Sequence, residues 1–199
     1  MSMTNYSGLK ASIANWLNRT DLTSEIPDFI SLAETRMAHE IRIPTIEKKV
    51  LLTPNSEGYS LIPSDYLEVK DVFFNNKPLQ RVSLTNIHTY SEASGTPTLF
   101  AREADKIKFF PTPTMSASDT LTMIYYYGVD PLSDSAPTNS LLQTAPELYL
   151  YGALVEAANF LGSDSGQWEM GYQTSYNRIM THLRYSEFSG ATPQIDNGY

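Results

Sequence analysis

Cysteine is absent from this sequence of 199 residues. Without a thiol the chain forms no disulfide and offers neither a thiolate nucleophile nor a cysteine ligand for zinc or an iron–sulfur cluster. The sequence also lacks the run of about 18 apolar residues that a membrane-spanning helix needs and the basic, then apolar, start of a secretory signal. We therefore expect a soluble, unprocessed protein with no membrane contact.

Positive charge is scarce as well. Fourteen Lys and Arg face 22 Asp and Glu, which gives a net charge of -8, and residues 131–199 contain two Lys or Arg against seven Asp or Glu. A protein that holds nucleic acid needs a basic stripe to displace counterions from the phosphates. The composition therefore disfavours tight binding of DNA or RNA.

Charged residues of both signs make up only 18% of the chain, against roughly 25% in an average protein. Tyrosine, by contrast, occurs 13 times. Its ring supplies apolar contact area and its hydroxyl a polar handle, a combination that is enriched at protein interfaces. This composition indicates extensive contact with other protein chains.

Catalytic and metal-binding motifs are missing. His39, His88 and His182 fall in different predicted elements without the paired spacing of metal ligands. There is no glycine-rich phosphate loop and no nucleophile elbow. We therefore expect no enzyme activity, no cofactor and no metal site.

Both ends of the chain have helical periodicity. Leu9, Ile13 and Leu17 recur at helical spacing in a first helix. Thr23 or Ser24 is expected to cap a second helix, which has a proline in its first turn and ends before Pro44.

Towards the C-terminus, residues 144–147 read Thr-Ala-Pro-Glu, the pattern of a capping box before a long apolar helix. Gly152, Ala153 and Ala157 leave room on that helix for a close neighbour. A last helix follows, capped by Asp164 or Ser165.

Between the helical ends, from residue 46 to residue 127, the apolar period changes to two, which is typical of strands. Asn75-Asn76 suits a tight hairpin, since Asn tolerates a positive φ. The expected strands are 48–53, 58–61, 67–74, 98–102, 106–110 and 120–127.

These patterns predict an α+β protein. Its N-terminal and C-terminal helices would form one helical bundle, because two amphipathic helices alone leave half of their apolar stripe uncovered. The predicted domains are a helical domain from residues 1–45 plus 141–188, an inserted β-rich lobe at 46–130, a linker at 131–140 and a flexible C-terminal tail at 189–199.

The order of elements and three stretches of sequence resemble the head-to-tail connector, or adaptor, proteins of tailed bacteriophages of the short-tailed type. The first stretch runs from Leu9 to Arg36 and contains the sequence Ile-Pro-Asp-Phe-Ile at residues 26–30. The second runs from Leu61 to Val69 and continues at residues 78–84, and the third is residues 146–154. The resemblance covers residues 5–186.

This resemblance implies a non-enzymatic structural protein of the virion, made in the host cytoplasm. Such a protein forms a ring, typically of twelve copies, that binds the portal on one side and a tail or nozzle protein on the other. DNA would pass through the channel without specific binding, and an acidic lumen would repel the phosphates. The alternative is a non-viral protein–protein interaction module of the same architecture.

The tail at 189–199 ends in apolar anchors, namely Pro193, Ile195 and Tyr199. In connectors that this chain resembles, the C-terminal extension commonly reaches the portal. The resemblance therefore implies that these three residues bind the portal, whereas composition alone is equally typical of a frayed terminus.

Overall fold

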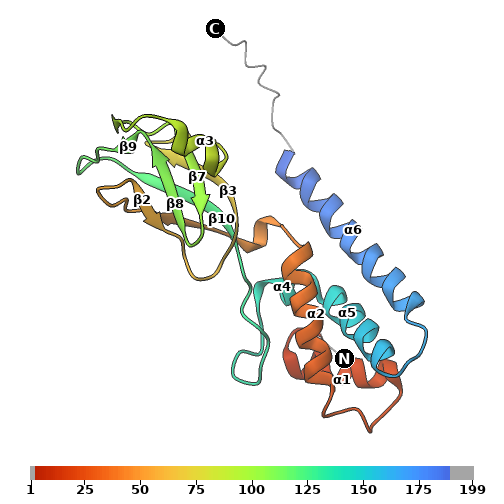
Figure 1. Cartoon of the computed structure of the whole chain (residues 1–199). Helices are drawn as coiled ribbons and strands as arrows, with labels where there is room; N and C mark the ends of the chain where they lie inside the picture. Colours follow the sequence, from red (N-terminus) through yellow and green to blue (C-terminus); the bar gives the residue numbers. More distant parts are fainter. Residues whose placement is uncertain (1–2, 189–199) are drawn as a thin grey trace. The chain divides into compact units, whose positions relative to one another are not determined.

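The computed structural model describes residues 3–188 of the chain, which form two compact units (Figure 1). The two ends of the chain, residues 1–45 and 129–199, belong to the helical unit, and residues 46–128 form the β unit. The predicted α+β class is confirmed.

The helical unit is organised around α5, which contacts every other helix of the unit (Figure 1). Its elements are α1 (Tyr6–Leu17), α2 (Ile26–Glu40), α4 (Ser140–Thr144), α5 (Pro146–Phe160) and α6 (Gly166–Phe188). Nine of the fifteen residues of α5 are buried. Because α5 is apolar on most of its circumference, it needs neighbours on several sides.

Two glycines allow the helices to approach closely. A Cβ on Gly152 of α5 would lie 3.0 Å from the Cβ of Ala33 on α2. A Cβ on Gly171 of α6 would lie 2.8 Å from the ring of Tyr151 on α5. The expected close approach at Gly152 is confirmed, and the equivalent role of Gly171 is a finding of the structure.

The predicted caps of α2 and α5 are wrong. Glu25 precedes α2 without a side-chain cap, because the Thr23 hydroxyl donates to the Thr20 carbonyl and the Ser24 hydroxyl to the Glu25 carboxylate. Thr144 does not cap α5, because it is the last residue of α4 and its hydroxyl donates to the Ser140 carbonyl at 2.9 Å. Residues 144–147 match the pattern of a capping box, but the preceding helix α4 ends at Thr144 and uses its hydroxyl.

The segment between the β unit and α4 belongs to the helical unit and packs on its first two helices. The Leu132 side chain is buried, and the Leu132 N–H donates to the Glu34 carboxylate of α2 at 2.8 Å. The Pro137 carbonyl accepts from the N–H of Tyr6, the first residue of α1. Asn139 then caps α4 by accepting from Leu142. These bonds connect the segment to α1 and α2.

The β unit contains two four-stranded sheets. The first has the order β1 (Glu47–Leu51), β10 (Leu121–Tyr127), β3 (Tyr66–Phe74) and β4 (Lys77–Pro78). The second has the order β2 (Tyr59–Leu61), β8 (Lys106–Phe110), β7 (Leu99–Glu103) and β5 (Gln80–Arg81). The β unit also contains a short parallel pair, β6 (Ser94–Gly95) and β9 (Thr112–Pro113), and the helix α3 (Leu84–Thr89). A 3₁₀ turn, η1 (Pro44–Ile46), precedes β1.

One apolar core joins the two sheets. Val72 and Met123 enter it from the first sheet, and Phe100 and Phe109 from the second. The chain passes directly from β4 to β5 through the buried Leu79, which closes one side of the sandwich. On the other side, β1 and β2 are the end strands of their sheets.

The expected strands agree with β1, β2, β3, β7, β8 and β10 to within two residues at each end. The hairpin at Asn75-Asn76 is confirmed, since both residues have positive φ and connect β3 to β4. The structure adds a helix, α3, capped by Ser83, in a stretch for which the sequence predicted no element. Six residues are too few to show helical periodicity.

Candidate functional site

The portal-binding residues predicted from the sequence, Pro193, Ile195 and Tyr199, lie outside the described residues. The surfaces that the structure does describe include two hollows with exposed apolar side chains. One lies at the open side of the β sandwich and the other on α2 and α5 of the helical unit.

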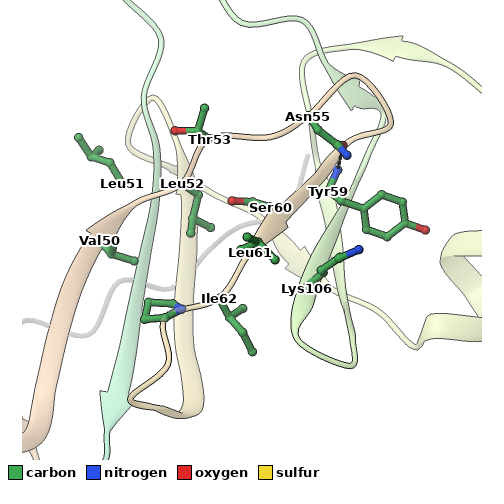
Figure 2. Close-up of a pocket in the computed structure, with 11 residues that line it drawn as sticks. Val50, Leu51, Leu52, Thr53, Asn55, Tyr59, Ser60, Leu61, Ile62 and Lys106 are labelled. Carbon is green, nitrogen blue, oxygen red and sulfur yellow. Dashed lines mark hydrogen bonds between the residues drawn. The ribbon is translucent and has the colours of Figure 1, made fainter.

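The first hollow, here called the edge groove, lies between β1 and β2 (Figure 2). Its volume is about 610 Å³, and its lining consists mainly of apolar side chains from residues 50–53 and 59–63. Leu51 and Leu61 border it and are each 66% exposed. Leu51 is the last residue of β1, and Leu61 is the last residue of β2.

The backbone of the edge groove is open at the same two leucines. Leu52 donates to Leu121 of β10, and Ile62 donates to the Asp105 carbonyl before β8. Since the groups of an antiparallel strand alternate in direction, those of Leu51 and Leu61 point away from the sheets. Asn55 covers the outward groups of Tyr59 through one backbone and one side-chain bond.

Positive charge accompanies the edge groove. Lys106 of β8 is the one charged residue among the groove's described lining residues. Lys49 lies on β1, two residues before Leu51, and its side chain is exposed on the same face of the strand. Lys48, on the other face, instead binds Asp65 at 2.6 Å.

The second hollow, here called the acidic patch, lies on α2 and α5 and has a volume of about 350 Å³. Leu32 of α2 is 54% exposed and Phe160 of α5 is 62% exposed. The ring of Phe160 packs against Phe29 with a centroid separation of 5.5 Å. The charged residues that line the acidic patch are all acidic, namely Glu25, Asp28 and Glu156.

Charge is unevenly divided between the two units. The helical unit carries six Lys and Arg against 13 Asp and Glu, whereas the β unit carries eight against nine. Four cations of the helical unit are already engaged in ion pairs: Lys10 with Asp134, Arg19 with Asp21, Arg36 with Glu40 and Glu169, and Arg178 with Glu147. The unit therefore presents excess negative charge.

A network of side chains connects α2 to α6. Arg36 lies over the Tyr172 ring, 4.1 Å from its centroid, and binds both carboxylate oxygens of Glu169. The Tyr172 hydroxyl donates to Glu40 at 2.8 Å. The guanidinium of Arg36 lowers the pKa of Glu169 to about 2.

Glu34 of α2 has the opposite environment. Its carboxylate is partly enclosed and accepts from the N–H of Leu132. Burial raises the pKa of Glu34, and the hydrogen bond from Leu132 only partly offsets this effect. Near Glu34, burial likewise raises the pKa of the Tyr149 hydroxyl.

His88 is the histidine that lies near a carboxylate among the described ion pairs. His88 Nε2 lies 3.4 Å from a carboxylate oxygen of Glu103, and both side chains are more than a third exposed. Tyr59 donates to the same carboxylate at 3.0 Å. Among the described residues, no group of three His, Cys, Asp or Glu side chains is placed to hold a metal ion, and no helix is both long and apolar enough to span a bilayer.

Sequence reasoning missed both surfaces. The leucines of the edge groove belong to strands that were expected correctly, but their exposure depends on the order of strands in each sheet. The acidic patch joins residues of α2 and α5 that are more than 100 positions apart. No local pattern in the sequence marks either surface.

Comparison with known proteins gives one match to a family. The model of the family described as SU10 adaptor protein matches residues 4–194, which is nearly the whole chain. No curated protein matches the chain. The match confirms the predicted class of phage adaptor, and the short-tailed type stays a prediction. The chain belongs to the SU10 adaptor protein family.

Proposed function

We propose that this phage adaptor forms a ring at the head–tail junction of the virion, where it joins the portal to a tail or nozzle protein. The ring would contain twelve copies and belong to a short-tailed phage. The observation that carries this proposal is the family match over residues 4–194. An adaptor needs binding surfaces rather than a catalytic centre, and the two exposed apolar hollows supply such surfaces.

Passage of DNA through the ring is the second part of the proposal. Six Lys and Arg against 13 Asp and Glu give the helical unit a strongly negative charge. A channel lined by such a surface repels the phosphates and offers few cations to bind the DNA backbone. DNA would therefore slide through without specific binding.

The C-terminal residues are proposed to reach the portal. Pro193, Ile195 and Tyr199 provide apolar anchors in the last 11 residues of the chain. A segment that orders on contact can fill a groove on a preformed partner. This assignment concerns the portal side of the ring and leaves the tail-side partner to other surfaces.

The experiment is to mix the full chain with purified portal and to determine the mass and symmetry of the product by native mass spectrometry and electron microscopy. We expect a stoichiometric complex with twelve copies of this chain, and binding of the tail protein only after that complex has formed. A portal that binds no copy at any concentration would contradict the proposal. A complex of another copy number would correct the ring size alone.

A further inference from the structure

Among the described residues, five large apolar side chains are more than half exposed, and all of them except Met170 occur in two pairs. Leu51 and Leu61 form one pair at the edge groove, and Leu32 and Phe160 form the other at the acidic patch. Exposed apolar clusters of this kind mark protein contacts. The two pairs lie on different units of the chain.

The charges at the two surfaces are complementary. Lys106 is the charged member of the edge groove lining, and the exposed Lys49 lies on β1, two residues before Leu51. The acidic patch contains Glu25, Asp28 and Glu156. No described ion pair engages Lys49, Lys106 or these three carboxylates. Each surface therefore presents an apolar centre and a charge that is left for a partner of the opposite sign.

Hydrogen-bonding groups are complementary as well. The N–H groups of Leu51 and Leu61 point away from their sheets, where they can donate to acceptors on a partner. Carboxylates are strong acceptors for backbone N–H groups, and the acidic patch has three of them. The amide of Asn159, which also lines the patch, can donate to an outward carbonyl of the edge strands.

A second apolar surface on the helical unit fits the edge groove less well. It includes Trp16 and Met170, which are exposed, together with Glu147 and Arg178. Glu147 and Arg178 already form an ion pair with each other. That surface therefore has no excess negative charge to offer to Lys49 and Lys106, and the acidic patch is the better partner.

We propose that the edge groove of one copy binds the acidic patch of the next copy, with Phe160 and Leu32 entering the groove between Leu51 and Leu61. Because the two surfaces differ, the contact is heterologous, and such contacts close into rings when the rotation between copies permits. The inference rests on the proposed ring and names the surfaces that build it. It concerns contacts between copies and not the contacts to the portal.

The absence of cysteine from the chain makes the contact directly testable. The double variant Leu61→Cys/Phe160→Cys carries one thiol on each surface, and both positions are exposed enough to tolerate the change. Under oxidation it should form a ladder of covalent oligomers on a non-reducing gel, with the portal present if rings form only there. An equal mixture of the two single variants should stop at dimers, and each single variant alone should stay monomeric.

Several outcomes would overturn the contact. Rings that form without a ladder from the double variant would exclude it while leaving the proposed ring intact. Dimers of the Leu61→Cys variant alone would indicate a symmetric contact between two edge grooves, and a fast-migrating monomer would indicate linkage within one chain. If neither rings nor ladders appear with or without portal, the proposed function fails together with this inference.

Charge exchange gives an independent measurement. Lys106→Glu and Glu156→Lys should each raise the protein concentration at half assembly about tenfold, and the double variant should recover most of the loss. Lys77→Glu is the matched control, because Lys77 is an exposed cation on β4, at the opposite end of the first sheet from β1. An effect of Lys77→Glu equal to that of Lys106→Glu would mean that net charge, and not this contact, controls assembly.

Discussion

Arg36 of α2 binds Glu169 of α6 through two parallel hydrogen bonds, from Nη1 to Oε2 at 2.8 Å and from Nη2 to Oε1 at 2.6 Å. The residues are 133 positions apart, so the pair connects the two ends of the chain. An Arg–carboxylate contact with two parallel bonds fixes orientation better than a single ion pair does. It therefore helps to orient α6, which packs on α5, relative to α2.

The Arg36–Glu169 pair predicts a specific loss of stability in acid. The pKa of Glu169 is about 2 in the folded protein and 4.5 without the fold, so its contribution is complete above pH 4.5 and is lost as the pH falls towards 2. Glu169→Gln should lower the free energy of unfolding at pH 7 by about 1 kcal/mol or less, because the carboxylate is partly exposed.

Urea denaturation at pH 7 and at pH 2.5 measures this difference. The gap between wild type and Glu169→Gln should shrink at the lower pH. Glu156→Gln serves as the control, since this carboxylate of α5 makes no ion pair among the described residues. A gap that is equal at both pH values would remove the Arg36 contact as its cause.

For Glu34 we expect the opposite dependence of stability on pH. Burial raises its pKa, so ionisation of Glu34 costs folding free energy as the pH rises above its unfolded pKa. Glu34→Gln keeps an acceptor for the Leu132 N–H and removes the charge, and we expect a higher Tm than wild type at pH 7.5 but an equal Tm at pH 4. Glu34→Leu, which leaves the Leu132 N–H without an acceptor, should lower the Tm at both values. A lower Tm for Glu34→Gln at pH 7.5 would refute this account.

The packing of α5 predicts a large loss of unfolding free energy when a buried leucine of this helix is replaced, and a small loss at an exposed leucine of α2. Leu154 of α5 is 0% exposed, so Leu154→Asp places a carboxylate in an apolar environment and should cost at least about 3 kcal/mol of unfolding free energy. Leu32→Asp makes the same change on an exposed position of α2 and should cost less than about 0.5 kcal/mol. Chemical denaturation of both variants is the measurement, and similar midpoints would contradict the central position of α5.

The excess of negative charge predicts weak contact with DNA. We expect a Kd for duplex DNA weaker than about 10⁻⁴ M at about 150 mM salt, since phosphate contacts require cations. Fluorescence anisotropy with a labelled duplex provides the test. A submicromolar Kd at this salt concentration would rule out a channel that lets DNA slide freely.

Removal of the C-terminal residues should weaken portal binding without lowering the thermal stability of the protein. A chain ending at Phe188 lacks Pro193, Ile195 and Tyr199. We expect its Tm to equal that of the full chain and its recovery in a portal pull-down to be strongly reduced. The triple variant Pro193→Ala/Ile195→Ala/Tyr199→Ala should behave like the truncation. Normal pull-down by either variant would exclude these residues as portal contacts.

Local patterns in the sequence predicted most of the elements because alternation and helical spacing depend on near neighbours. The Asn75-Asn76 turn, for example, needs only two residues that accept positive φ. Thr144 marks the limit of such reasoning, because α4, which ends at this residue, uses its hydroxyl. A capping pattern cannot tell which of two adjacent helices will take the side chain.

The candidate surfaces depend on information that local patterns do not contain. Leu51 and Leu61 are exposed because β1 and β2 end their sheets, and the order of strands is fixed by long-range pairing. The charge of the helical unit is likewise clear only when residues 1–45 and 129–199 are counted together. Composition predicted contact with other chains but gave no position for it.

Because the helical unit is built from both ends of the chain, synthesis on the ribosome imposes an order of events. The β unit is complete at Gly128, whereas the first residue of α5 is Pro146. The apolar stripe of α2, which includes Phe29 and Met37, therefore waits for its partner helix until the last third of translation. A nascent chain interrupted before α5 would contain a complete β unit and the amphipathic helices α1 and α2 without the helix on which they pack.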